Sequence, residues 1–337
     1  MKPETSGPDP APPSRREFLR RAVQAGAGVA VTAALGAWLL DRRPPGTIGR
    51  IAAVDARRSF GPKGAGPTLS IITGRARRQM LRRGLAAVGG IERFIARGDR
   101  VLIKVNAAFA SPAALAATTH PDVAAELVTL CLAAGAASVI VTDNPINDPE
   151  SCFELTGIGP AVRAAGGRLF VPRADSFHPG TVEGSRLIRD WPVLHSPFAG
   201  VTKLIGTAPV KHHHRAGASM TLKNWYGLLG GRRNQFHQDI DGIVSELARM
   251  VTPTFVVLDG AQSMMSNGPT GGSLADLKET RTLVVSTDPV AADAYGATLL
   301  GKTHRDLPYL AAAAALGAGT VDFESLRPVR AAAEEEG

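Results

Sequence analysis

Short apolar runs alternate with helical segments in the first half of the chain, and this alternation constrains the fold more than any other feature. Runs rich in β-branched residues cover 100–106, 138–142 and 168–171, separated by the helical segments 118–133 and 151–165. Strands that alternate with helices form a parallel sheet with right-handed crossovers. We therefore predict an α/β fold, with a largely parallel sheet and flanking helices. A division into two lobes around a central cleft is left open.

The pattern extends in both directions along the chain. We expect strands at 48–54, 201–209, 254–258 and 282–286, and helices at 75–88, 239–250 and after Pro289. Open α/β sheets bind ligands at the carboxyl ends of their strands. Polar residues fall at such predicted ends or just after them: Lys104, Asn106, Asp143, Asn144 and Asp259.

The N-terminus carries paired arginines, Arg15-Arg16, followed by Phe18-Leu19 and by nineteen uncharged residues, Ala22–Leu40. This segment resembles a twin-arginine translocation signal; the alternative is a buried Ala-rich helix after a basic turn. The resemblance implies the twin-arginine export machinery as a partner, contact with the membrane through this segment, and a periplasmic location. Cleavage and retention as an anchor are both open. The expected organisation is a signal or anchor at 1–45, one domain at 46–330 and a tail at 331–337.

Composition excludes several classes of protein. The formal net charge is +8, but residues 50–104 hold thirteen basic and three acidic side chains, whereas residues 105–337 are net acidic. No basic motif with interleaved aromatic residues accompanies this stretch, so we expect no nucleic-acid partner. The two cysteines, Cys131 and Cys152, are too few for a disulfide scaffold or an intrinsic iron–sulfur cluster.

The densest polar stretch is 211–227, which follows a predicted strand. In a strand, His212 and His214 share one face and His213 takes the other; outside a strand the three are freer. Imidazoles bind metals or move protons, and a lysine holds anions or forms covalent links. We predict His213, Lys223 and Lys104 as catalytic residues, and His212, His214 and His237 as ligands of a metal ion. The alternative is a set of surface or hydrogen-bonded histidines with a structural role.

A glycine-rich loop, 266–272, is the second candidate. Successive backbone amides in such a loop can form an anion-binding nest, although the loop matches neither nucleotide-binding fingerprint and an ordinary tight turn is the alternative. The predicted residues that contact a cofactor or ligand are Asn106, Asp143, Asn224, Gly268, Thr270, Gly271 and Gly272.

Several motifs in order resemble the domain of unknown function 362 family. They are 101–106, 118–121, 211–214 with 221–227, 258–260, 268–272 and 286–293. The resemblance spans about residues 50–325 and implies no particular reaction. Many relatives carry an appended iron–sulfur segment, which has no counterpart in this sequence.

A fainter similarity links the chain to nickel-pincer lactate racemases. His213 and Lys223 enclose an Ala-Gly-x-Ser segment, 216–219, in matching register. The resemblance implies proton transfer by His213, a covalent cofactor on Lys223 and a metal ligand at His237. Met220-Thr221-Leu222 stands where the racemases have Gly-Gly-Pro.

The leading hypothesis is an exported protein, either an enzyme or a cofactor carrier, that binds a metal ion or an anionic small molecule. The rival is a non-catalytic solute- or metal-binding protein tethered at the membrane. We predict that five side chains converge on one cleft: Lys104, Asp143, His213, Lys223 and Asp259.

Overall fold

The computed structural model describes residues 15–17, 54–62, 66 and 68–333. The described residues from Val54 to Ala333 belong to one compact unit and are not divided into two lobes. Arg15, Arg16 and Glu17 are helical, whereas the rest of the expected export signal, including 18–19 and 22–40, lies outside the described residues. Within the described residues, no helix is long and apolar enough to span a bilayer.

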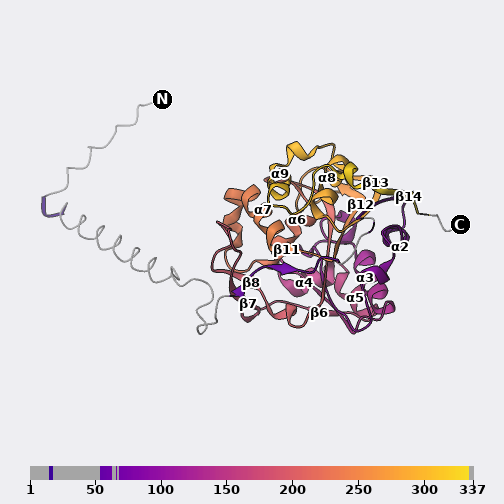
Figure 1. Cartoon of the computed structure of the whole chain (residues 1–337). Coiled ribbons are helices and arrows are strands. Elements are labelled where there is room, and N and C mark those ends of the chain that lie inside the picture. Colours follow the sequence, from indigo (N-terminus) through magenta and orange to yellow (C-terminus); the bar gives the residue numbers. More distant parts are fainter. Residues whose placement is uncertain (1–14, 18–53, 63–65, 67, 334–337) are drawn as a thin grey trace, which may run out of the picture. The chain divides into compact units, whose positions relative to one another are not determined.

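The centre of the body is a mostly parallel sheet, as predicted (Figure 1). Its strands lie in the order β14 (Val329–Ala332), β3 (Leu69–Thr73), β13 (Leu277–Ser286), β12 (Phe255–Met264), β9 (Lys203–His213), β4 (Arg100–Lys104), β5 (Ser138–Thr142) and β6 (Arg168–Phe170). A ninth strand among the described residues, β10 (Gly217–Ser219), forms a hairpin with β9. Apart from β10, only β13 runs against its neighbours. The carboxyl ends of β4, β5, β9 and β12 therefore meet at one edge.

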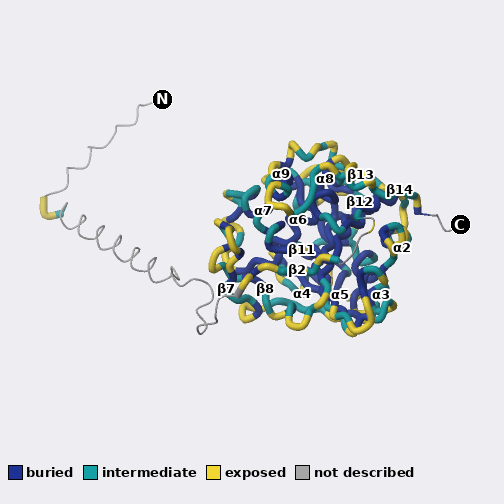
Figure 2. Tube along the Cα trace, in the orientation of Figure 1, coloured by how far each residue is buried: buried dark blue, intermediate teal, exposed yellow. Residues whose placement is uncertain are grey.

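Helices cover both faces of this sheet. On one face pack α2 (Arg77–Ala87), α3 (Pro121–Ala133), α4 (Pro149–Leu155) and α5 (Ile158–Ala164); on the other pack α6 (Thr221–Asn224), α7 (Ile240–Met250), α8 (Pro289–Leu299) and α9 (Pro308–Ala315). Alternate side chains of one strand enter the two cores: Val257 packs on the α2 side and Leu258 on the α8 side. Because both faces are covered, the central strands are buried along their length (Figure 2) and read as continuous apolar runs.

Smaller sheets complete the body. β1 (Val54–Asp55), β7 (Phe177–Thr181) and β8 (Trp191–Leu194) form one, and β2 (Arg58–Ser59) pairs with β11 (Val251–Thr252). Of the strand expected at 48–54, only Val54 lies within the described residues, where it begins β1.

Local sequence explains where the helices begin and end. α3 begins where expected, because the His120 ring accepts a hydrogen bond from the Asp122 amide at 3.2 Å and Pro121 occupies the first turn. The single helix expected at 151–165 is in fact two, α4 and α5. Gly157, with φ of +75°, separates them in a left-handed conformation that ends the first helix.

Other boundaries differ because partners far along the chain decide them. β9 was expected to end at residue 209 but continues to His213, where β10 pairs with it. β14 reaches Ala332, two residues into the expected tail, because it adds to β3. Neither α9 nor β3 was predicted from local pattern.

Candidate functional site

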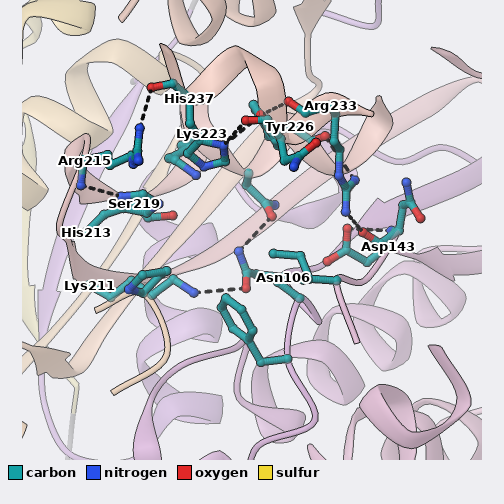
Figure 3. A pocket seen from close by; sticks show the side chains of 18 of the residues that line it. Asn106, Asp143, Lys211, His213, Arg215, Ser219, Lys223, Tyr226, Arg233 and His237 are labelled. Atoms are coloured by element: carbon teal, nitrogen blue, oxygen red, sulfur yellow. Dashed lines mark hydrogen bonds between the residues drawn. The ribbon is translucent and has the colours of Figure 1, made fainter. Parts of the chain in front are cut away.

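A pocket of about 700 Å³ opens at the carboxyl ends of β4, β5 and β9 (Figure 3). α6 and the two 3-10 segments that follow it, Trp225–Leu228 and Arg233–Asp239, supply its other wall. Four of the five side chains expected to converge do line it: Lys104, Asp143, His213 and Lys223. Asn106, Asn144 and Asn224 line it as well.

Asp259 is the exception, and for this residue the predicted convergence is wrong. Its neighbours Val257 and Ala261 on alternate positions of β12 pack in the α2-side core. Asp259 points the same way and accepts a hydrogen bond from Arg77 Nε at 2.8 Å. The strand alternation therefore turns this carboxylate away from the pocket.

Lys104 forms a balanced buried ion pair with Asp143. Its Nζ lies 2.6 Å from Asp143 Oδ1, 2.7 Å from the Val105 carbonyl and 3.1 Å from Asn224 Oδ1, which uses all three N–H donors. The other Asp143 oxygen accepts the Ala107 amide at 2.6 Å. Burial lowers the pKa of Lys104 and the Asp143 charge opposes that shift. With all three donors in use, Lys104 holds the strand ends and α6 together at the pocket floor.

Gly227 packs directly on this ion pair. A methyl group at its Cα would lie 2.2 Å from Asp143 Oδ1 and 2.7 Å from Lys104 Nζ. A glycine is therefore required for the close approach of the Trp225–Leu228 segment to the floor.

Two asparagines connect the floor to a second lysine. The Asn224 amide donates to the carbonyls of Lys104 and Thr207, at 3.2 and 3.1 Å, which ties α6 to the sheet. Asn106 donates to Asn224 at 3.4 Å and accepts from Lys211 Nζ at 3.3 Å (Figure 3). Both predicted asparagines thus hold positions in a hydrogen-bond chain.

Lys211 and Lys223 differ from Lys104 because, in the part of the chain that the structure describes, no carboxylate pairs with either. Lys211 Nζ donates to the Ala117 carbonyl and lies 5.2 Å from the centre of the Phe109 ring. Lys223 Nζ lies 5.0 Å from the Tyr226 ring centre, and among the described residues it has no hydrogen bond or ion pair. Burial, with Lys223 nearby, lowers the pKa of Lys211 to about 7; burial, with Arg233 nearby, lowers that of Lys223 to about 8.

His213 presents a fixed neutral ring. Its Nδ1 accepts the backbone amides of Arg215 and Ala216, both at 3.2 Å, so the hydrogen of the neutral ring is on Nε2. Burial and the positive charge of Lys223 lower the pKa of His213 to about 2. The ring therefore acts as a hydrogen-bond donor through Nε2, and the proton-transfer role expected from the racemase resemblance does not fit this geometry.

His214 and His237 each stack with His213, with ring centroids 5.0 and 5.9 Å away. His237 Nδ1 lies 3.0 Å from the Asn234 carbonyl and 3.2 Å from the Tyr226 hydroxyl. A carbonyl oxygen accepts only, so Nδ1 carries the hydrogen. Burial lowers the pKa of His237, with Lys223 adding to the effect.

The predicted metal-binding trio does not assemble. His212 lies on the opposite side of β9 from His213, and its Nδ1 accepts the Gly268 amide at 3.1 Å. It does not line the pocket that His214 and His237 line. Within the described part of the chain, no group of three or more His, Cys, Asp or Glu side chains is arranged to hold a metal ion.

The glycine-rich loop serves packing instead of lining the pocket. A methyl group on Gly268 would lie 1.9 Å from the His212 carbonyl, and the Gly271 amide is used within the loop by the Asn267 carbonyl at 3.0 Å. Of the loop, Pro269 reaches the pocket, whereas the four predicted ligand contacts Gly268, Thr270, Gly271 and Gly272 do not.

The pocket carries a marked excess of positive charge. Among the described residues that line it, Asp143 is the single carboxylate, already paired. The cations that line it are Lys104, Lys211, Arg215, Lys223, Arg232 and Arg233. Arg233 also braces the wall by donating to the Asn144 and Leu229 carbonyls, at 2.6 and 3.1 Å.

One supporting residue was missed by sequence reasoning. Asp293 of α8 accepts the amides of Thr221 and Leu222, both at 2.9 Å, and so caps the short helix that carries Lys223. Burial raises the pKa of Asp293 to about 7. Asp293 is the last residue of the 286–293 motif. Its hydrogen-bond partners lie about seventy positions earlier in the chain, so the sequence around Asp293 gives no sign that it caps a helix.

Lys211 could have been found, since it alternates with His213 on one face of β9.

Comparison with known proteins places the chain in a family. A thylakoid-associated protein, sll1697 of Synechocystis sp., is 24% identical over 265 residues, which cover 74% of this chain and 78% of that protein. The family model described as a domain of unknown function, DUF362, matches residues 101–298. This match spans more than half of the 337 residues and includes nearly all of the pocket, so the chain belongs to the DUF362 family.

Proposed function

We propose that the pocket binds an anionic small molecule, with Lys223, Lys211 and the Nε2–H of His213 as its main contacts. The observation that carries the proposal is Lys223: the residue is only 9% exposed, it lines the pocket, and its ammonium group has no hydrogen-bond or ion-pair partner among the described residues. Burying an unpaired charge is costly, and an anion in the pocket would offset that cost.

The same charges argue against a metal ion in this pocket. A cation would enter among six basic side chains with one carboxylate that is already paired. His213 offers no free lone pair, because its Nδ1 accepts two amides. The nickel cofactor implied by the racemase resemblance needs that ring as a base, so the residues do not fit it.

Ligand-dependent thermal unfolding of the full chain tests the proposal. Glutarate and inorganic phosphate should each raise the midpoint, whereas Ni²⁺ and Zn²⁺ should not, because only a ligand of the folded state stabilises it. Lys223→Met and Lys211→Met should each remove most of the anion effect, and Lys278→Met, at an exposed position, should not. An unchanged midpoint with both anions, or full retention of the effect in both pocket variants, would contradict anion binding.

We also propose that the chain is exported by the twin-arginine route and works at or near a membrane outside the cytoplasm. Support comes from Arg15-Arg16, Phe18-Leu19 and the uncharged run 22–40. The name of the thylakoid-associated relative is consistent with a membrane-proximal site of action. Changing both arginines to lysine should retain the protein in the cytoplasm; cell fractionation that finds the variant outside at the wild-type level would reject this route.

A further inference from the structure

We propose that Lys223 forms an imine with the carbonyl group of a bound 2-oxo acid, so that the pocket is a covalent site for anionic carbonyl compounds. This inference rests on the anion-binding function proposed above and adds a substrate class and a reacting atom. It follows from the contrast among three buried lysines that share one pocket.

Only one of the three has an amine free to react. Lys104 has all three donors committed, one of them to a carboxylate. Lys211 has a pKa lowered to about 7 by burial, but its Nζ is held by contacts to the Ala117 carbonyl and to Asn106 Oδ1. Lys223 Nζ has no acceptor among the described residues and contacts the Tyr226 ring.

Two further features favour a nucleophilic amine at Lys223. Its side chain is buried on α6 and faces other cations, which are the conditions that make a lysine amine available near neutral pH. The pKa of Lys223 falls to about 8 and that of Lys211 to about 7, so the hydrogen-bond partners of the two lysines, and not their pKa values, distinguish them. Asp293 and Asn224 anchor both ends of α6, so the amine is held in place before a ligand arrives.

The surrounding donors define the ligand. The Lys211 ammonium and the Nε2–H of His213 suit a carboxylate, and Lys223 supplies the group that reacts with an adjacent carbonyl carbon. A 2-oxo acid has these two groups side by side. The pocket volume of about 700 Å³ leaves room for a substituent beyond them.

The step balances without an added oxidant or reductant. Lys223 Nζ adds to the carbonyl carbon, and the carbonyl oxygen takes up the two hydrogens of the amine and leaves as water. A C=N bond thereby replaces the C=O bond. The imine is reversible, and the excess of positive charge in the pocket stabilises the carboxylate beside it.

Reductive trapping of the full chain tests the assignment. The protein is treated with 2-oxoglutarate and sodium cyanoborohydride, then examined by intact mass and peptide mapping. We expect one adduct per chain, located at Lys223, and none with glutarate, which lacks only the carbonyl. Lys278, an exposed lysine, reports the background of surface alkylation.

Two readouts separate this inference from the proposal beneath it. Lys223→Arg should lose the adduct, because a guanidinium forms no imine under these conditions, and stabilisation of the wild type by glutarate reports anion binding separately. Trapping at Lys211, equal trapping at Lys278, or no adduct while glutarate still stabilises the wild type would overturn the imine and leave anion binding standing. Failure of glutarate and phosphate to stabilise the wild type would overturn both.

Discussion

The pocket has two regions built from the same residue type with opposite electrostatic balance. On the floor, Lys104 is matched by Asp143 and by two further acceptors. On the wall, Lys223 is 9% exposed, against 0% for Lys104, and has no acceptor among the described residues. Burial alone therefore does not distinguish a structural lysine from a ligand-binding one, whereas the hydrogen-bond and ion-pair partners of the ammonium group do. The floor should matter for folding, and the wall should matter for binding.

The largest effect on stability is expected when the Lys104–Asp143 ion pair at the pocket floor is disrupted. Asp143→Asn leaves Lys104 buried without its counter-charge, and removing one partner of such a pair destabilises by about 3–5 kcal/mol. Urea unfolding at neutral pH measures this loss. In a double-mutant cycle, adding Lys104→Met to Asp143→Asn should recover much of the stability; simple additivity of the two single losses would mean that the pair is not energetically coupled.

A smaller loss of stability is expected when the Trp225–Leu228 segment of the wall is forced away from the ion pair. Gly227→Ala places a methyl group against Asp143 and Lys104, and overpacking of this kind costs about 1–3 kcal/mol. Gly61→Ala is the control, because Gly61 is exposed and its added methyl would lie 3.3 Å from the nearest side-chain atom. If both variants unfold at the wild-type urea midpoint, the close packing of Gly227 on the ion pair is not important for stability.

Substitution of Lys223 in the pocket wall should raise the free energy of unfolding, whereas substitutions at the floor lower it. Lys223→Met removes an unpartnered buried charge, and the displacement of its pKa from 10.5 to about 8 corresponds to a gain of roughly 2 kcal/mol in the free energy of unfolding, discounted for the side chain's partial access to solvent. The ligand-free variant should therefore be more stable than the wild type at pH 7 while binding anions poorly. A variant less stable than the wild type would indicate that Lys223 has a structural role like that of Lys104.

The smallest expected effect is a pH dependence of the extra stability of Lys223→Met over the wild type. Below pH 8, Lys223 is protonated in both the folded and the unfolded chain, and the cost of the buried charge is fully present. Between pH 8 and 10.5 the unfolded chain binds more protons at this position, so the free energy of unfolding of the wild type rises with pH. The advantage of Lys223→Met should shrink across this window in urea melts. An advantage that is constant from pH 7 to 10.5 would show that it comes from packing instead of charge.

The amino-acid sequence was enough to predict the α/β class, six of the nine strands of the central sheet and the edge of the sheet where polar side chains gather. It did so because strand and helix periods are local, and β4 and β5 carry their polar ends, Lys104 and Asp143, within a few residues of an apolar run. The same local pattern placed His213 and Lys223 near that edge. It could not show that β12 turns Asp259 toward Arg77, since that depends on which face of the sheet α2 covers.

What each pocket residue can do depends on contacts between distant parts of the chain. Lys104 meets Asn224, 120 positions away, whereas Lys223 meets no acceptor among the described residues, and no property of a lone lysine in a sequence distinguishes the two. The backbone turn after β9 sets the tautomer of His213, and Asp293 of α8 caps the helix of Lys223. Hydrogen-bond partners and desolvation are properties of neighbours in space, and the fold alone determines which residues become neighbours.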